Sequence, residues 1–502
     1  MLHDLTFLGG SLPAFAILTV LIGTFLGLFI GAMPGLGPLM GIILMLPVAF
    51  YMDPVSGMGL LIAIYVAGSC GGAISAILLR VPGTPLAAVT LLDGYPMAQK
   101  GQAGEAVGLA ITASAIGGLL SGVVLVFGAP RLAAFAVNFS APEFFALAIT
   151  GILAVVVVAG DSFAKGIIAG LLGILIATVG TDPMSSVTRF TYDNNDLLGG
   201  IGIVPAVVGL FALPELANQI LGGRTEGRRD IGKFRVSFRS IGTVFNDKFN
   251  LLRSSVIGTF LGALPGAGGV MASFTAYAVA KSSARDSSEY GHGAKGGVIA
   301  SEAANNACCG GALIPTLALA IPGDAAAAVL MGALLLLGLQ PGPQLFTLSG
   351  DLVEGVFAVY LLANVFLLVL GFALAPLFAS VLKIQNRFLI PLILVLSVVG
   401  TFAVQSSQFD LWIMLGFGAI GFGMHRFGYP AAPLVIGLVL GPLLESNMRR
   451  SLLLSGGELD IFVQRPISAT ILAVNLLVLV VVLIRALRRK DKAPETLPSL
   501  GD

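Results

Sequence analysis

Four polar residues interrupt the otherwise apolar stretch SEAANNACCGGALIPTLALAIPGDAAAA, residues 301–328: Glu302, Asn305, Asn306 and Asp324. Carboxylate and amide oxygens suit hard cations such as Na+, and buried amides need partners that a binding cavity supplies. The stretch therefore predicts a site in which Asn305 and Asn306 bind a substrate. It also predicts a Na+ site made from Asp324, Asn305 and Glu302.

Each of these residues also has a purely structural interpretation. Asp324 precedes four alanines, so it can be the N-cap of a helix that starts at Ala325. Asn305 and Asn306 can form hydrogen bonds between helices. Glu302 can be a helix-start charge, a cation ligand or a proton carrier, and the sequence does not choose among these.

The elements that position these residues are predicted to be transmembrane helices. Of the 502 residues, 56% are hydrophobic and 11% are charged, whereas soluble domains have about 25% charged residues. Apolar runs recur along the chain, from Leu12–Ala32 to Ser468–Ile484, and a run of about 20 apolar residues spans a bilayer as a helix. The composition predicts an all-α polytopic membrane protein.

Several other classes of protein are disfavoured. A net charge of +1 gives no reason to expect a nucleic-acid partner. The three cysteines lack the spacing of zinc ligands, and no G-x-x-x-x-G-K-[ST] motif for ATP occurs. We therefore expect no cofactor.

Basic residues are concentrated in two segments, between Gly222 and Arg253 and from Arg485 to Lys492. Because cytoplasmic loops of membrane proteins are enriched in Lys and Arg, we expect both the central linker and the C-terminus to lie in the cytoplasm.

The two sides of the central linker resemble each other. GAMPGLG at 31–37 corresponds to GALPGAG at 262–268, and VPGTPLAA at 81–88 corresponds to IPGDAAAA at 321–328. CGGA occurs at 70–73 and again at 309–312, in the same order in each half. We infer a duplicated unit.

The predicted domains follow from this duplication. They are a first membrane repeat at 12–221, a basic cytoplasmic linker at 222–252, a second membrane repeat at 253–460, a C-terminal transmembrane helix at 461–490 and a cytoplasmic tail at 491–502. The C-terminal helix has no counterpart in the first repeat. If it is an extra crossing, each repeat crosses an odd number of times, and the two repeats are inverted.

Proline and glycine interrupt both repeats at corresponding positions, a sequence feature that points to the binding site of a secondary transporter. Broken helices and re-entrant hairpins are expected there, because freed backbone groups must line a cavity or a ligand. The candidate substrate-binding residues at these breaks are Pro34, Gly35, Gly37, Pro82, Gly83, Thr84, Gly266, Gly268, Pro322 and Gly323. Close helix packing through small residues is the alternative; it explains the glycines better than the prolines.

Four blocks of the chain resemble the TctA family, the large membrane subunit of the tripartite tricarboxylate transporters. They are GAMPGLGP at 31–38, VPGTPLAAVTLLDGYPMAQKG at 81–101, GALPGAG at 262–268 and the long block at 301–346. The resemblance implies a permease in a bacterial inner membrane. It would work with a small TctB-like membrane subunit and a periplasmic TctC-like solute-binding protein. The implied substrate is citrate or another di- or tricarboxylate, taken up by symport with a cation, usually Na+.

Arg80 departs from the family pattern, where a neutral polar residue is expected before VPGTP. A guanidinium can hold a carboxylate with two hydrogen bonds, so Arg80 is a candidate substrate ligand. The alternative is an Arg that extends to the membrane interface or pairs within the protein. The following Asp93-Gly94-Tyr95-Pro96 segment is expected to form a surface turn.

Three other functions are weighed against this one. An intramembrane enzyme needs a nucleophile and a base within reach of each other, and it does not require two corresponding helix breaks. A channel would lack saturable, ion-coupled uptake. A permease of the same family for a different organic anion would keep the fold and mechanism and change only the substrate.

Overall fold

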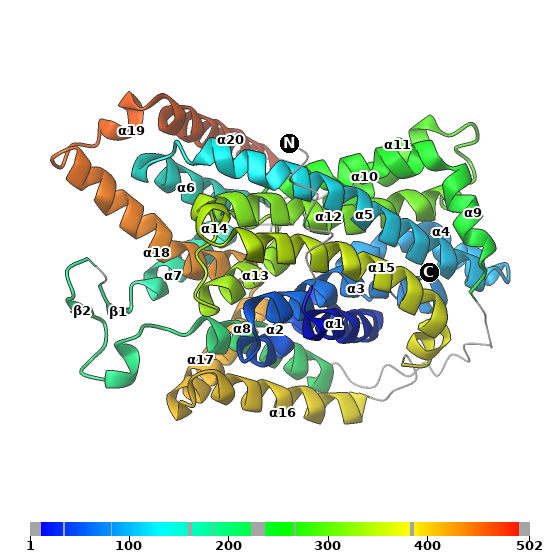
Figure 1. Ribbon diagram of the computed structural model, residues 1–502, viewed down its shortest axis with the longest axis horizontal. Coiled ribbons are helices and arrows are strands. Elements are labelled where there is room, and N and C mark those ends of the chain that lie inside the picture. Colours follow the sequence, from blue (N-terminus) through cyan, green and yellow to red (C-terminus); the bar gives the residue numbers. More distant parts are fainter. Residues whose placement is uncertain are drawn as a thin grey trace, which may run out of the picture.

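The protein is helical over most of its length (Figure 1). The computed structural model describes residues 12–33, 36–81, 83–158, 163–182, 184–221, 236–265, 268–381 and 386–490. Pro34, Gly35, Pro82, Gly266, most of the basic linker and the tail from residue 491 therefore lie outside the described residues.

The helices of the first half are α1 (Ala14–Ala32), α2 (Gly37–Phe50), α3 (Pro54–Leu79), the 3-10 helix η2 (Pro85–Ala88), α4 (Thr90–Gln99), α5 (Ala103–Ala136), α6 (Ala141–Val158), α7 (Phe163–Ala177), the 3-10 helix η3 (Asn195–Leu197) and α8 (Ile203–Leu221). Between α7 and η3, the strands β1 (Gly180–Thr181) and β2 (Thr188–Arg189) pair antiparallel, with Gly180 opposite Arg189.

The helices of the second half are α9 (Arg239–Asn246), α10 (Lys248–Ala263), α11 (Gly268–Ser283), α12 (Lys295–Leu319), α13 (Ala325–Leu336), α14 (Pro343–Leu348), α15 (Gly350–Val381), α16 (Asn386–Gln405), α17 (Gln408–Arg426), α18 (Ala431–Leu454), α19 (Ile461–Gln464) and α20 (Pro466–Lys490). Helices α9 and α10 thus begin within the segment that the sequence assigns to the linker.

Within the described ranges, five helices are long and apolar enough to cross a membrane: α1, α3, α5, α15 up to Leu377, and α18. Shorter apolar helices include α2, α7, α13 and part of α20. The sequence prediction of an all-α polytopic membrane protein agrees with this architecture. Helix α3 is apolar all round and buried along its length, as expected for a helix enclosed by others.

Glycines allow two helix pairs to approach closely. A Cβ on Gly31 of α1 would lie 2.2 Å from the carbonyl oxygen of Gly68 in α3, and one on Gly262 of α10 would lie 2.4 Å from that of Cys308 in α12. Small residues repeated every four positions produce this kind of contact in membrane helices. Gly27 and Gly258, one turn earlier, face α3 and α12 in the same way.

The long helices of one half pack against those of the other. Helix α5 lies along α12, and α15 lies along α3. Helices α6 and α7 pack on α18, whereas α16 and α17 pack on α8. Figure 1 shows α16 and α17 at one edge of the molecule and α10 and α11 at the opposite edge. The central helices α3 and α12 are therefore enclosed by elements from both halves.

Helix α20 is attached through α6. Arg465, just before α20, donates to Glu143 at 2.6 Å, and the side chains of Ser468 and Asn475 donate to backbone carbonyls of Pro142 and Ala146. Glu143 also accepts from the backbone N–H of Ser140, which is one of the two hydrogen bonds of a capping box at the start of α6.

Candidate functional site

The helices break where the sequence predicts. Helix α1 ends at Ala32 and α2 begins at Gly37, which has a φ of +61°. In the other half α10 ends at Ala263 and α11 begins at Gly268, with a φ of +63°. Glycine adopts this left-handed conformation at little cost, so Gly37 and Gly268 permit two similar turns.

A second pair of breaks follows α3 and α12. Arg80 and Ala320 end these helices in the left-handed conformation, with φ of +60° and +56°. Thr84 then caps η2 by accepting from Ala87 N at 3.3 Å, and Asp324 caps α13 by accepting from Ala327 N at 2.8 Å. The N-cap interpretation of Asp324 thus matches the geometry.

Each of these two breaks contains a glycine at a close backbone contact. We call Gly83 and Thr84, after α3, the first tip, and Gly323 and Asp324, after α12, the second tip. A Cβ on Gly83 would lie 2.5 Å from the carbonyl oxygen of Gly31, and one on Gly323 would lie 2.6 Å from that of Gly262. No side chain fits at such distances without movement of the backbone. The first tip therefore packs against the C-terminal end of α1, and the second tip packs against the C-terminal end of α10.

Asp324 is partly exposed, and both of its carboxylate oxygens have donors. Oδ1 accepts from Ala327 N, and Oδ2 accepts from the hydroxyl of Tyr65 at 2.5 Å. Tyr65 is in α3, so this bond joins the second tip to the first half of the chain.

Glu302 is fully buried in α12. Its Oε1 accepts from the hydroxyl of Thr90 at the start of α4. Its Oε2 accepts from Ser114 of α5 at 2.9 Å and from the amide of Asn305 at 3.4 Å. Ser301 lies 3.0 Å from the Thr90 hydroxyl. Oxygen-bearing groups from three helices thus surround this carboxylate.

The two asparagines are also fully buried. The Asn305 side chain donates to the backbone carbonyl of Ser69 at 3.1 Å, but among the described residues no donor reaches its Oδ1. In the same part of the chain, neither side-chain polar atom of Asn306 has a partner. Unpartnered buried amides are uncommon and costly, so these atoms mark a place where a ligand can complete the hydrogen bonding.

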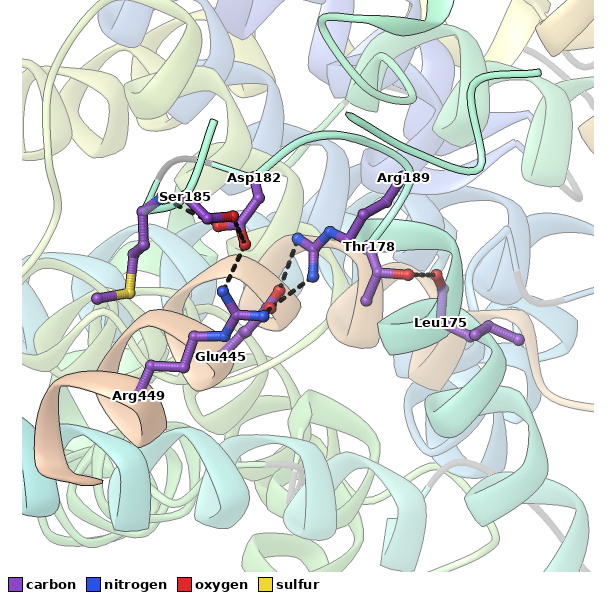
Figure 2. Close-up of polar contacts among 8 residues, drawn as sticks. Leu175, Thr178, Asp182, Ser185, Arg189, Glu445 and Arg449 are labelled. Carbon is purple, nitrogen blue, oxygen red and sulfur yellow. Dashed lines mark hydrogen bonds and ion pairs between the residues drawn. The ribbon is translucent and has the colours of Figure 1, made fainter. Parts of the chain in front are cut away.

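Several charged groups elsewhere form ion pairs. Figure 2 shows Asp182, next to β1, in an ion pair with Arg449 of α18; Arg449 also contacts Glu445, which in turn pairs with Arg189. Hydrogen bonds from Ser185 and from the Met184 N–H, together with Arg449, hold the pKa of Asp182 well below its usual range. In the part of the chain that the structure describes, no Lys or Arg pairs with Glu302 or Asp324.

A family model described as the tripartite tricarboxylate transporter TctA family matches residues 17–436. The chain belongs to the TctA family. It is 37% identical over 478 residues, 93% of both chains, to a relative from Agrobacterium vitis called the uncharacterized 52.8 kDa protein in the TAR-I ttuC' 3'region. A second relative from that organism, in the TAR-II ttuC' 3'region, is 37% identical over 233 residues, 46% of this chain and 96% of the relative. No solved structure matches.

In this TctA-family chain several of the described candidates lie near one another. An added Cβ on Gly37 would lie 3.5 Å from Thr84, and one on Gly269, next to Gly268, would contact Leu86 and lie 3.5 Å from Asn305 Oδ1. The starts of α2 and α11 thus both face the first tip. Pro322 is buried beside Gly323 at the second tip.

Arg80 lies apart from this group. Its side chain is exposed, and its guanidinium carbon is 5.7 Å from the centre of the Tyr95 ring, a cation–π distance. No hydrogen bond or ion pair joins the guanidinium to a residue in the described ranges.

The expectation of a surface turn at Asp93 is wrong. Asp93 is fully buried within α4, where it accepts from the Tyr277 hydroxyl at 2.9 Å and from the backbone N–H groups of Gly291, Gly293 and Ala294. The carboxylate accepts hydrogen bonds from backbone N–H groups of a loop in the other half of the chain. These bonds outweigh the turn preference of the local Asp-Gly and Tyr-Pro pairs.

Sequence reasoning missed Thr90, Ser114, Ser69 and Tyr65, which contact the polar residues of α12 and its tip. The sequence feature that could have indicated these residues is a hydroxyl group within an apolar helix. That signal is weak, because Ser and Thr often bond their own helix backbone, as Thr112 does to Gly108.

Proposed function

We propose that this chain is the large permease subunit of a binding-protein-dependent secondary transporter. It imports a di- or tricarboxylate such as citrate by symport with Na+. Its proposed partners are a small TctB-like membrane subunit and a periplasmic TctC-like solute-binding protein. Membership of a tripartite tricarboxylate transporter family supports the class. The observation that carries the mechanism is a buried carboxylate without a counter-charge, hydrogen-bonded to Asn305, whose amide oxygen is near the start of α11.

The proposed architecture is two inverted repeats with re-entrant hairpins in a bacterial inner membrane. Corresponding backbone contacts at Gly31 and Gly262, and corresponding caps at Thr84 and Asp324, support a duplicated unit. In this arrangement the central linker and the C-terminus are cytoplasmic, and α20 is the extra crossing. Their basic residues support that orientation.

The substrate carboxylates are proposed to bind at the breaks. Helix N-termini attract anions through their free N–H groups and the helix dipole, and α2 and α11 both start beside the first tip. The residues assigned to the substrate are Pro34, Gly35, Gly37, Arg80, Pro82, Gly83, Thr84, Gly266, Gly268, Asn305, Asn306, Pro322 and Gly323.

Arg80 is proposed to hold one substrate carboxylate. Its guanidinium is exposed beside the first tip and has donors available, and a bidentate contact would add a charge-assisted hydrogen-bond pair. Arg80→Ala is expected to raise the half-saturating substrate concentration about tenfold, equivalent to about 1.4 kcal/mol. An unchanged half-saturating substrate concentration would show that Arg80 does not bind the substrate.

Uptake into proteoliposomes tests the proposal as a whole. The complete complex is reconstituted, the binding protein is loaded with each member of a carboxylate panel, and uptake is measured with and without an inward Na+ gradient. The proposal predicts uptake of one class of carboxylate that requires both the binding protein and the gradient. Uptake that requires neither would overturn it, and the panel identifies the anion.

A further inference from the structure

The surroundings of Glu302 have the composition of a cation site. The carboxylate supplies two oxygens, and the hydroxyls of Thr90, Ser114 and Ser301 lie next to it or to one another. A hydroxyl group can donate or accept, so the same oxygens that now donate to Glu302 can turn a lone pair toward an ion. Oxygen ligands of this kind suit hard cations.

Asn306 provides an independent indication of a ligand. It lies one helical turn after Glu302 on the same face of α12, and side chains in a helix lean toward its N-terminus. Asn306 is therefore on the side of α12 that carries Glu302. Asn306 is fully buried, and neither its oxygen nor its nitrogen has a hydrogen-bond partner within the ranges that the structure describes.

The charge of the site favours a monovalent ion. A buried carboxylate without a counter-charge is costly in a membrane protein, and none of the ion pairs in the described ranges includes Glu302. One monovalent cation neutralises one carboxylate, whereas a divalent ion would leave an excess positive charge. A proton would need only one acceptor oxygen and would leave the Asn306 amide unpartnered.

We propose that Glu302, Thr90 and Ser114 form a Na+-binding site between the two halves of the chain, with Asn306, assigned above to the substrate, as a ligand that the ion and the substrate share. The inference rests on the proposed function for its role: the bound ion is the coupling ion of carboxylate uptake. Thr90 and Ser114 come from α4 and α5, and Glu302 comes from α12. Movement of α12 relative to α4 and α5 would separate the ligands, so ion occupancy and conformation are linked.

Equilibrium binding of radioactive Na+ to the purified full-length chain tests the site without substrate or binding protein. Glu302→Gln is expected to abolish saturable binding. Thr90→Val and Ser114→Ala are each expected to raise the half-saturating Na+ concentration about tenfold, equivalent to about 1.4 kcal/mol. Thr90→Ser keeps the hydroxyl and should stay within about threefold of the wild type.

Thr112→Val is the matched control. Thr112 is fully buried on α5, two residues before Ser114, and its hydroxyl donates to the Gly108 carbonyl of its own helix. This variant loses a buried hydroxyl outside the site, so its Na+ binding should equal that of the wild type. The comparison of Thr90→Val with Thr112→Val stays decisive even if Glu302→Gln does not fold.

Three results would overturn the site. The first is wild-type Na+ binding in Thr90→Val, Ser114→Ala and Glu302→Gln. The second is an equal loss in Thr112→Val, which would make the effect one of packing. The third is no Na+ binding by the wild type together with a pH-dependent melting temperature that Glu302→Gln removes, which would make Glu302 a proton carrier.

The site and the proposed function fail separately. Na+ binding that depends on Glu302, with no uptake of any carboxylate on the panel, would leave the site standing and overturn the function. Na+-driven carboxylate uptake that persists unchanged in Glu302→Gln would leave the function standing and overturn the site.

Discussion

Two regions of the molecule differ in how their carboxylates are stabilised. Near the β1–β2 hairpin, Asp182 and Glu445 alternate with Arg449 and Arg189 in a continuous set of ion pairs (Figure 2). In the centre, Glu302 is fully buried and is surrounded only by neutral donors. In the hairpin network each carboxylate is neutralised by an arginine of the protein. Glu302 has no such positively charged partner in the described ranges.

We interpret the charges of the ion-pair network as structural and the charge of Glu302 as functional. Paired carboxylates join elements that are distant in sequence, as Glu143 joins α6 to Arg465 before α20. A buried carboxylate without a counter-charge is costly unless enough donors or a cation stabilise it. Asp93 is stabilised by one hydroxyl and three backbone N–H groups, whereas the amide atoms near Glu302 that lack a partner among the described residues leave room for an ion ligand.

Removal of a partner from a paired carboxylate should give the largest loss of stability. Glu143 is buried and Arg465 is partly exposed, so Arg465→Ala leaves an uncompensated charge and is expected to cost about 2–3 kcal/mol. Glu302→Gln removes an uncompensated charge and should not lower the melting temperature in Na+-free buffer. A loss of stability in Glu302→Gln as large as that in Arg465→Ala would make Glu302 a structural charge too.

Packing around the second tip gives the next largest effect. A Cβ on Gly323 would lie 2.6 Å from backbone atoms of Gly262 and Ala312, so Gly323→Ala is expected to cost roughly 1–3 kcal/mol. Gly242 in α9 has no such neighbour within 4 Å, and Gly242→Ala should be neutral or slightly stabilising. Thermal unfolding of the two variants measures the difference; equal effects would mean that the tip is not tightly packed.

Asp324 sharpens the comparison, because it is also a carboxylate without an ion pair but has a different environment. It is partly exposed, and it caps α13 through Ala327 N. Asn is as good an N-cap as Asp, so Asp324→Asn should change stability by less than about 0.5 kcal/mol and keep the Na+ dependence of uptake. A tenfold rise in the half-saturating Na+ concentration would make Asp324 an ion ligand instead.

The sequence predicted the features that depend on local chemistry. Proline and glycine marked the breaks between α1 and α2 and after α12, and the four alanines after Asp324 marked a helix start. These signals act over a few residues, so one chain is enough to show them.

Tertiary pairing could not be predicted in the same way. Thr90 and Ser114 are about as polar as many Ser and Thr residues that bond their own helix, and only the fold brings them to Glu302. Asp93 was misplaced for the same reason, since its four donors come from a loop and a helix in the other half of the chain. The substrate-binding assignments stay predictions.

The most direct test of the central claim is the accumulation of carboxylate against a gradient in proteoliposomes containing the complete complex, with Glu302→Gln compared with Glu445→Gln. Glu445 belongs to the paired network. We predict that Glu445→Gln accumulates substrate in response to a Na+ gradient as the wild type does, while Glu302→Gln accumulates none. Na+-driven accumulation in Glu302→Gln at the wild-type level would contradict the account.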